Sequence, residues 1–303
     1  MQLFDAEATR SRLPYGALVE ALRAMFVSGC EVPPRHVHAI GGVGTSLLMP
    51  AWRVGAFFGV KVVNVFPANR ERGLPAVNGA YTLFDAGTGI ALAQMDGSEI
   101  TTRRTAAASA LAASFLARRD ARRLVVVGAG RIAAQMADAM RAVRPGIDEV
   151  TVWNHRPEHA AALAARIGGR TTTDLESAVR RADIVSCATL SQAALVQGDW
   201  LAEGAHLDLI GSFTPAMREA DARAVQRARV FVDTEDALAE AGDLLQAMAE
   251  GAFHHPALQG TLATLCRGQS EGRRDGREIT LFKSVVSALE DLAAAELVWR
   301  APR

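Results

Sequence analysis

The chain has 303 residues, 50% of them hydrophobic and 22% charged, so it is long enough to bury the cores of roughly two domains. Its 33 basic residues balance 33 acidic ones, and zero net charge excludes the broad basic surface that binds nucleic acid or an anionic membrane. With three cysteines, no signal-peptide pattern and no apolar stretch near the ~18 residues that span a bilayer, we expect a reducing, cytoplasmic location.

The first third of the chain changes from a helical to a strand-like pattern. Apolar residues recur at helical spacing from Pro14 to Gly29, which predicts an opening helix. Between Ser46 and Met95, short apolar runs separated by Gly and Pro predict an antiparallel sheet. The Ala-rich stretch from Thr101 to Arg119 predicts a helix that leads out of a first domain. We place the domain boundary near residues 118–123.

Beyond this helix, short apolar runs alternate with helical segments. The expected strands are 124–130, 149–154, 183–189, 206–211, 229–233 and 279–282, and the expected helices are 131–143, 157–167 and a last one from about Ser284 to Trp299. The polar, Gly-rich stretch 267–278 is typical of a loop. Alternation of this kind predicts an α/β fold, a doubly wound parallel sheet with helices on both faces.

The segment VVVGAGRIA carries the strongest motif. Gly128, Gly130 and Ala133 have the G-x-G-x-x-A spacing, after an expected strand and at the start of an expected helix. Gly128 permits a tight turn, Gly130 lets the backbone approach a pyrophosphate, and Ala133 permits close packing of helix on strand. The phosphates would lie at the helix N-terminus, where N–H groups and the dipole favour anions. The motif predicts a Rossmann dinucleotide-binding domain and hence a nicotinamide-dependent oxidoreductase.

The end of the second strand of this domain bears on cofactor choice. NAD-selective domains place a carboxylate there for the ribose 2′-hydroxyl, whereas an Arg accommodates a 2′-phosphate. This chain has Asn154, His155 and Arg156 at that point, and no carboxylate. Arg156 can pair with a phosphate and Asn154 can donate a neutral hydrogen bond. We therefore expect NADP(H) in preference to NAD(H); a solvated Arg at a strand end is the alternative.

Several segments together resemble the ornithine cyclodeaminase/mu-crystallin family over nearly the whole chain. They are PPRHVH, LLMP, KVVNVFPANRERGLP, ALAQMDGSEITTRRTAAASALAA, VVVGAG, IGSFTPAMREAD, FVDTEDALAEAGDL and ITLFKSVVSALEDLAAA. The resemblance implies a Rossmann domain, residues 120–283, joined to an α+β substrate and dimerisation domain made from residues 1–119 and 284–303. It also implies a homodimer.

The same resemblance assigns site residues. Arg35, Lys61 and Arg104 match the family's substrate-binding cations, with Lys61 and Arg104 as the catalytic pair, and Val285 joins the substrate site. A carboxylate of an α-amino or α-imino acid favours a bidentate Arg, and a nearby Lys can exchange protons. Besides Gly128, Gly130, Asn154, His155 and Arg156, the expected cofactor contacts are Thr105, Arg131, Ile132, Cys187, Ala188, Thr189, Gly211, Ser212 and Ser284.

Other chemically suggestive residues have structural interpretations. Cys187 is typical of a small buried apolar residue rather than a nucleophile. Asp291 is expected to be a helix carboxylate that faces a basic partner. The Arg-rich runs 118–123 and 273–277 are expected to be solvated loops. The histidines have no metal-binding spacing, and we expect no metal site; these are His36, His38, His254 and His255.

The expected function is NAD(P)H-dependent reduction of a small cyclic ketimine carboxylate to the cyclic amino acid. Ornithine cyclodeamination and alanine dehydrogenation are the enzymatic alternatives, and a mu-crystallin-like ligand-binding protein is the non-enzymatic one. In the family's cyclodeaminases and alanine dehydrogenases, an Asp stands two residues after the glycine of the loop at 211, where this chain has Phe213. A carboxylate could hold a substrate ammonium group and relay its protons, whereas Phe cannot, which favours the reductase.

Overall fold

The computed structural model describes residues 1–302, except for the side chain of Arg70. Its contacts divide the chain into two compact units, residues 1–104 with 287–303 and residues 105–286. The division falls within one long helix, α3 (Gly97–Leu116), and so differs from the expected boundary near 118–123. None of the helices within residues 1–302 has the length and apolar character needed to cross a membrane.

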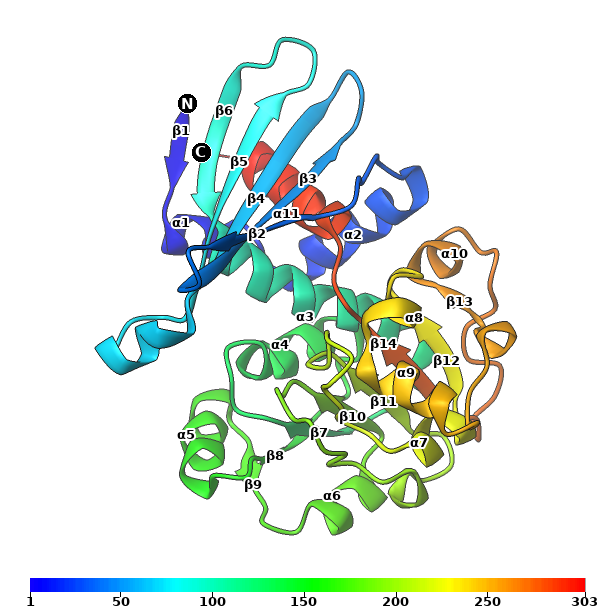
Figure 1. Cartoon of the computed structure of the whole chain (residues 1–303). Helices are drawn as coiled ribbons and strands as arrows, with labels where there is room; N and C mark the ends of the chain where they lie inside the picture. Colours follow the sequence, from blue (N-terminus) through cyan, green and yellow to red (C-terminus); the bar gives the residue numbers. More distant parts are fainter. Residues whose placement is uncertain (303) are drawn as a thin grey trace. The chain divides into compact units, whose positions relative to one another are not determined.

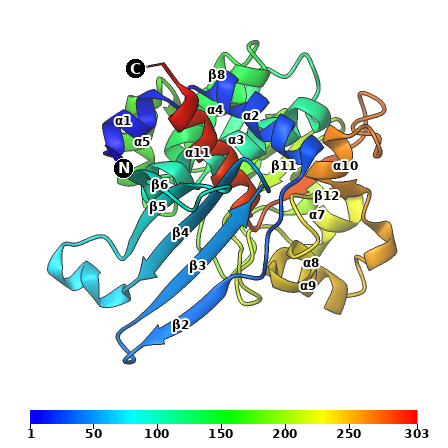
Figure 2. The same cartoon turned by 90° about the horizontal axis from the view of Figure 1, so that it is seen from above.

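The first unit is a six-stranded sheet with helices on one face (Figures 1 and 2). Its strands have the order β1-β6-β5-β4-β3-β2, and all neighbouring pairs are antiparallel except β1 with β6, which is parallel. The strands are β1 (Gln2–Phe4), β2 (His36–Ile40), β3 (Gly44–Trp52), β4 (Phe57–Val65), β5 (Val77–Asp85) and β6 (Ala91–Asp96). The antiparallel sheet expected between residues 46 and 95 is confirmed, but β1 and β2 lie outside it and were not predicted.

Two helices, α2 and α11, pack against each other in this unit, and α11 lies against β3, β4 and β5. The helical segments are α1 (Ala6–Ser11), α2 (Tyr15–Ser28), the 3₁₀ turn η1 (Pro67–Arg72), the first part of α3, and α11 (Ala288–Arg300). The expected opening helix is confirmed: α2 buries Leu18, Leu22, Met25 and Phe26, and Gly29 ends it with a φ of 75°.

The last helix begins four residues later than expected. Ser287 caps the N-terminus of α11 through its side chain, which accepts a hydrogen bond from the N–H of Leu289. Val286 before it has a φ of 69°, a left-handed conformation that a helix cannot include. The segment 284–287 is therefore an irregular connection, and the prediction of helix from Ser284 is wrong at this end.

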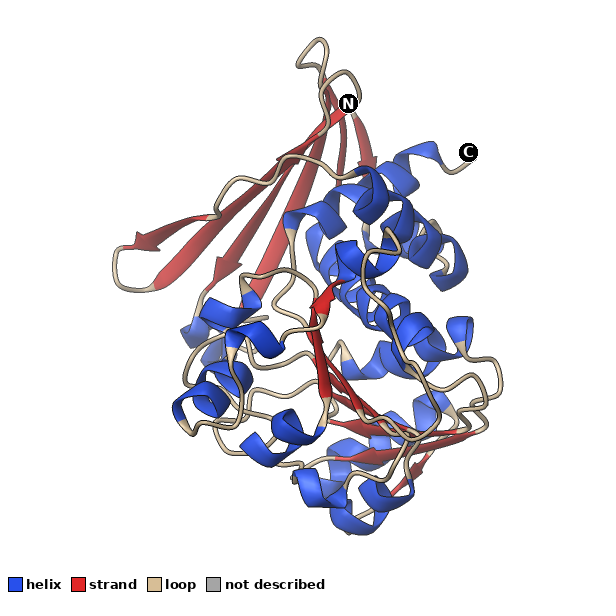
Figure 3. Ribbon diagram, turned by 90° about the vertical axis from the view of Figure 1, so that its right-hand side faces the viewer, coloured by secondary structure: helices blue, strands red, loops and turns tan. Residues whose placement is uncertain are grey.

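The second unit is a parallel eight-stranded sheet with helices on both faces (Figure 3), which confirms the α/β doubly wound fold. The order is β13-β12-β14-β11-β10-β7-β8-β9. Its strands are β7 (Arg123–Val127), β8 (Glu149–Trp153), β9 (Arg170–Thr171), β10 (Ile184–Cys187), β11 (His206–Leu209), β12 (Arg229–Val232), β13 (Gly260–Thr261) and β14 (Thr280–Lys283). Strand order reverses between β7 and β10, and a ligand is expected outside the carboxyl ends of these strands.

The helices of this unit fill the connections between strands. They are α4 (Ala133–Val143), α5 (Pro157–Ile167), α6 (Leu175–Arg181), α7 (Ala222–Arg227), α8 (Ala237–Glu240), α9 (Gly242–Ala249) and α10 (Leu262–Cys266), with 3₁₀ turns η2 (Gly198–Trp200) and η3 (His255–Ala257). Residues 267–278 form the expected loop. The central strands are buried on both faces, as their continuous apolar sequences require.

Candidate functional site

The first unit holds a buried cluster of two cations and two carboxylates. Lys61 Nζ on β4 lies 2.6 Å from Asp291 Oδ2 on α11. Arg104 on α3 donates from Nε to Asp291 Oδ1 at 2.7 Å and from Nη1 to Glu290 Oε2 at 3.0 Å. All four side chains are fully buried. The structure thus joins the two predicted catalytic cations through Asp291, and the expectation that Asp291 faces a basic partner is confirmed.

In this cluster, the cations of Lys61 and Arg104 face the carboxylates of Asp291 and Glu290. Burial and the charge of Arg104 lower the pKa of Lys61 to about 8, although Asp291 opposes the shift. Burial disfavours the ionised form of Asp291, but Arg104 and Lys61 outweigh it and hold its pKa below the ordinary value. Lys61 can therefore gain or lose a proton near neutral pH. Arg104 contacts the two carboxylates through Nε and Nη1, and its third nitrogen, Nη2, is not part of these contacts.

Tyr81 is a neighbour of this cluster that the sequence analysis missed. It lies on β5 directly opposite Lys61 in the β4–β5 register and is fully buried. Within residues 1–302, no hydrogen-bond partner is found for its hydroxyl. Burial, with Asp291 nearby, raises the pKa of Tyr81 well above its ordinary value, so the phenol stays neutral. Only the strand register could have found it, because a single Tyr in a strand is typical of a core residue.

Arg35 stands directly before edge strand β2 and is half-buried. The ion pairs that define the cluster are made by Lys61 and Arg104 with the carboxylates of α11. A role of Arg35 in substrate binding stays a prediction.

In the second unit, the glycine turn has the form that a dinucleotide site requires. Gly128 follows β7 with a φ of 118°, and a Cβ there would lie 2.6 Å from the carbonyl oxygen of Ala188. Gly130 has open space where a side chain would stand, and Ala133 is fully buried at the start of α4. Arg131 and Ile132 form the turn between them, with Arg131 exposed. These residues suit a pyrophosphate at the N-terminus of α4.

The loop after β8 contains the three residues expected to bear on cofactor choice, and one of them, Asn154, already makes a hydrogen bond within the loop. The side-chain oxygen of Asn154 accepts a hydrogen bond from the backbone N–H of Arg156 at 2.9 Å, which leaves its amide nitrogen for a ligand. His155 and Arg156 are exposed. The exposed guanidinium of Arg156 therefore places a positive charge on this loop.

The loops after β10 and β11 are tied together by Glu219, a buried residue that the sequence analysis missed. Its carboxylate accepts hydrogen bonds from the N–H and the hydroxyl of Thr189 and from the N–H of Gly211. Ser212 is buried, and its hydroxyl donates to the carbonyl of Met217. Cys187 ends β10, and Ala188 directly follows it. Burial raises the pKa of the Cys187 thiol well above its ordinary value, so the thiol stays neutral.

Asp233 organises the connection between β14 and α11. Its carboxylate accepts from the hydroxyl of Ser284 at 2.9 Å and from the N–H groups of Val285 and Val286 at 2.8 and 2.6 Å. The side chain of Val285 is buried in the hydrophobic core of the second unit. Of the remaining expected contacts, Thr105 is buried on α3. Roles for Ser284, Val285 and Thr105 toward ligands stay predictions.

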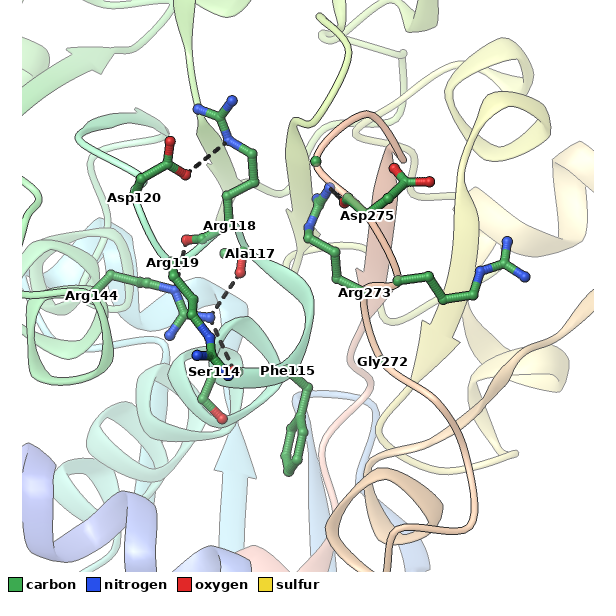
Figure 4. Close-up of a pocket in the computed structure, with 12 residues that line it drawn as sticks. Ser114, Phe115, Ala117, Arg118, Arg119, Asp120, Arg144, Gly272, Arg273 and Asp275 are labelled. Carbon is green, nitrogen blue, oxygen red and sulfur yellow. Dashed lines mark hydrogen bonds and ion pairs between the residues drawn. The ribbon is translucent and has the colours of Figure 1, made fainter.

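A cavity of about 550 Å³ in the second unit lies away from these loops (Figure 4). It is lined by residues that precede β7 and β14, at the amino ends of parallel strands, whereas the glycine turn is at the carboxyl ends. Position rather than size therefore argues against this cavity as the cofactor site. Its basic lining residues include Arg118, Arg119, Arg144, Arg273 and Arg274.

The lining also corrects the expectation that both Arg-rich runs are solvated loops. Arg118 is half-buried and donates to Asp183 at 2.6 Å. Arg273 is half-buried and donates from Nε to the carbonyl of Leu116 at 2.6 Å; burial lowers the pKa of Arg273 to about 10. Arg144 is buried, and its guanidinium donates to backbone carbonyls at the end of α3. Backbone carbonyls left over at a helix end explain why these cations turn inward.

Within residues 1–302, no group of three or more His, Cys, Asp or Glu side chains is arranged to hold a metal ion.

The similarity of this chain to known proteins extends over nearly its whole length. The model of the ornithine cyclodeaminase/mu-crystallin family matches residues 6–301. The chain belongs to this family. Δ1-pyrroline-2-carboxylate reductase of Paracoccus denitrificans is 39% identical over 298 residues, 95% of this chain and 93% of that protein.

Two solved structures also have folds similar to that of this chain. Δ1-pyrroline-2-carboxylate reductase of Thermococcus litoralis, in complex with NADH and L-proline, is 31% identical, with a TM-score of 0.92 over 99% of this chain and 96% of that one. An archaeal alanine dehydrogenase dimer with bound NAD is 28% identical, with a TM-score of 0.91 over 99% and 95% of the two chains. The fold of this ornithine cyclodeaminase/mu-crystallin family member is thus that of nicotinamide-binding enzymes.

Proposed function

We propose that the chain is an NAD(P)H-dependent reductase of cyclic ketimine carboxylates, which converts Δ1-pyrroline-2-carboxylate or Δ1-piperideine-2-carboxylate to L-proline or L-pipecolate. The observation that carries the proposal is the buried Lys61–Arg104–Asp291 cluster in a chain whose relatives include reductases of this class. A reduced nicotinamide supplies the hydride for the imine carbon, and a proton goes to the nitrogen.

Each member of the cluster has a task in this scheme. Arg104 binds the substrate carboxylate through Nη2 while Asp291 and Glu290 hold its other nitrogens. Lys61, whose pKa burial lowers to about 8, supplies a proton to the imine nitrogen. Asp291 positions both cations. The unprotonated imine brings one negative charge, its carboxylate, to Arg104, and the proton that Lys61 gives up converts the bound substrate to a zwitterion.

The alternative activity, ornithine cyclodeamination, is tested by direct comparison. Purified protein is expected to oxidise NADPH with the two cyclic imines at least ~100-fold faster than it releases ammonia from L-ornithine with NAD⁺, since a missing acid–base group costs about 10²–10⁴-fold. Phe213, 47% exposed after β11, stands where a carboxylate would act. F213D is expected to raise ammonia release, and F213A is the control. Fast ammonia release without imine-dependent NADPH oxidation would contradict the proposal.

The proposed cofactor preference is NADPH over NADH, supported by the exposed Arg156 and the missing carboxylate after β8. One charged contact to the 2′-phosphate is worth about 1.5–3 kcal/mol, or roughly ten- to a hundredfold in Kd. The R156A substitution is expected to remove this preference, because it raises the Kd of NADPH and leaves the Kd of NADH unchanged. Fluorescence titration with both cofactors measures the two Kd values. R166A, which removes an exposed Arg from the other end of α5, is the matched control. Tighter binding of NADH than NADPH by the wild type would show that Arg156 does not serve this purpose.

We also propose a homodimer in the cytoplasm. The edge strand β2 is exposed along its whole length, and it carries Val37 and Ile40, 58% and 42% exposed, with Val43 nearby at 62%. An exposed edge with apolar side chains favours pairing with another chain. Light scattering tests the dimer as a mass twice 32.2 kDa. All three cysteines are free, which agrees with a reducing compartment, and cell fractionation tests the location.

A further inference from the structure

Glu219 is a buried carboxylate that has no task in the proposed reaction. It lies between β11 and α7 and has no exposed surface. Its Oε1 accepts from the N–H of Thr189 at 2.6 Å and from the Thr189 hydroxyl at 2.8 Å, while Oε2 accepts from the N–H of Gly211 at 2.7 Å. One carboxylate thus joins two loops whose contacting residues, Thr189 and Gly211, are 22 residues apart in the sequence.

These two loops are neighbours at the ligand-binding edge of the sheet. Thr189 follows β10 and Gly211 follows β11, and the two strands are paired in parallel. A Cβ on Gly211 would overlap the carbonyl oxygen of Thr189, so the two backbones touch. The carbonyl of Ala188, one residue earlier, lies against Gly128 of the glycine turn. The carboxylate of Glu219 therefore fixes backbone that borders the expected dinucleotide site.

Glu219 is itself held by further buried charges. Its N–H donates to Asp243 Oδ1 on α9 at 2.7 Å. The other oxygen of Asp243 lies 3.5 Å from Lys283 Nζ on β14, and Lys283 donates to the carbonyl of Leu209 at 3.2 Å. Lys283 therefore contacts the last residue of β11, directly before the loop that Glu219 holds. Buried charges linked in this way favour one arrangement, because loss of a charged member leaves its partner uncompensated.

We propose that Glu219 is a positioning residue that locks the loops after β10 and β11 in the backbone shape that receives the nicotinamide half of the cofactor. This inference rests on the proposed function for the location of the cofactor. It assigns Glu219 no contact with the cofactor, and it assigns the adenosine half to the glycine turn and the loop after β8.

The decisive measurement separates the two halves of the cofactor. In E219Q, the amide oxygen can still accept from Thr189, but the NH₂ group then faces the N–H of Gly211, so the link between the loops is lost. We expect the Kd of NADPH to rise about ten- to a hundredfold, the cost of one charged hydrogen bond, while the Kd of 2′,5′-ADP, which lacks the nicotinamide half, stays within about twofold.

The matched control is D208N. Asp208 is another fully buried carboxylate of the same sheet, and the side-chain donors that it meets among residues 1–302 are the hydroxyls of Ser109 and Ser186, which can rotate to suit an amide. D208N therefore keeps its own hydrogen bonds, although Asp208 interacts electrostatically with Lys283. The D208N substitution is expected to leave both Kd values unchanged. T189V provides a second variant in case E219Q does not fold, since it removes only the hydroxyl donor. For T189V we expect a rise of about three- to tenfold in the Kd of NADPH alone.

A pH series gives a readout that general destabilisation would not. Burial raises the pKa of Glu219 to about 7, with Asp243 adding to the shift and Lys283 and Thr189 opposing it; the Cys187 thiol on β10 stays neutral. The ionised carboxylate accepts all three hydrogen bonds with its charge, whereas the protonated carboxyl is neutral and holds the same N–H groups more weakly. In the wild type, the ratio of the NADPH Kd to the 2′,5′-ADP Kd should therefore increase as the pH falls through about 7, and in E219Q it should not.

The outcomes are distinct. Equal rises in both Kd values, or no change in either, in E219Q and T189V would overturn the positioning role. A wild type that binds NADPH in this pattern but reduces no imine contradicts the proposed function alone. A wild type that binds neither NADPH nor NADH overturns both.

Discussion

R104M is expected to lower kcat/KM for imine reduction by about a hundredfold or more, because the charged hydrogen bond to the substrate carboxylate is worth up to about 3 kcal/mol. The same substitution removes one of the cations that face the two buried carboxylates Asp291 and Glu290, while Lys61 still pairs with Asp291. Loss of one partner of a buried ion pair costs about 3–5 kcal/mol of folding stability. Steady-state kinetics and thermal unfolding of the variant are therefore both expected to change.

A double variant separates these two effects. R104M with E290Q removes one carboxylate charge together with the cation, so it is expected to recover part of the unfolding free energy but none of the activity. NADPH binding, measured by fluorescence, should stay nearly intact in both variants, since neither Arg104 nor Glu290 is an expected cofactor contact. Unchanged turnover in R104M would remove Arg104 from the substrate site.

Above about pH 8, the rate of imine reduction is expected to fall about tenfold for each pH unit. The cause is Lys61, whose pKa burial and Arg104 lower to about 8. Lys61 is protonated below that pH and can supply the proton; above it, the neutral amine cannot. The pH profile of kcat under saturating imine and NADPH measures this limb directly.

The substrate imine also titrates, so the profile needs a control. K61R keeps a positive charge on β4 but does not lose its proton in this range, because the pKa of a guanidinium lies far above that of an ammonium group. The limb near pH 8 is expected in the wild type and absent from K61R, whose maximal rate should be lower. The same limb in both proteins would assign the titration to the substrate and contradict the role of Lys61.

Much of the fold was predictable because each local pattern agreed with the structure. The strand–glycine–helix run at Gly128 and the Ala-rich helix before it are specified by residues close together in sequence. Strand β2 was missed because all five of its residues are exposed and show no alternation of buried and exposed positions. The start of α11 was misplaced because the hydrogen bonds to Asp233, about 50 residues away, override local helix propensity.

The candidate site was predictable only in part, for a related reason. Lys61 and Arg104 were found through the family resemblance, and the structure adds that Asp291 joins them. Glu219 and Tyr81 were missed because their surroundings come from distant segments: Glu219 faces two loops, and Tyr81 faces Lys61 across a strand pair. Neither residue belongs to a short motif, so no spacing along the chain identifies it.

The connection at Val286 has a consequence for how this family can vary. A β-branched residue with a φ of 69° costs about 1–3 kcal/mol in backbone strain, and glycine would adopt the same conformation without this cost. Here two consecutive N–H groups donate to the Asp233 carboxylate and offset the strain. We therefore expect positions 233 and 286 to be coupled in one direction. A lineage with valine at 286 depends on a carboxylate at 233 to keep this turn, whereas a lineage with glycine at 286 is free to lose it.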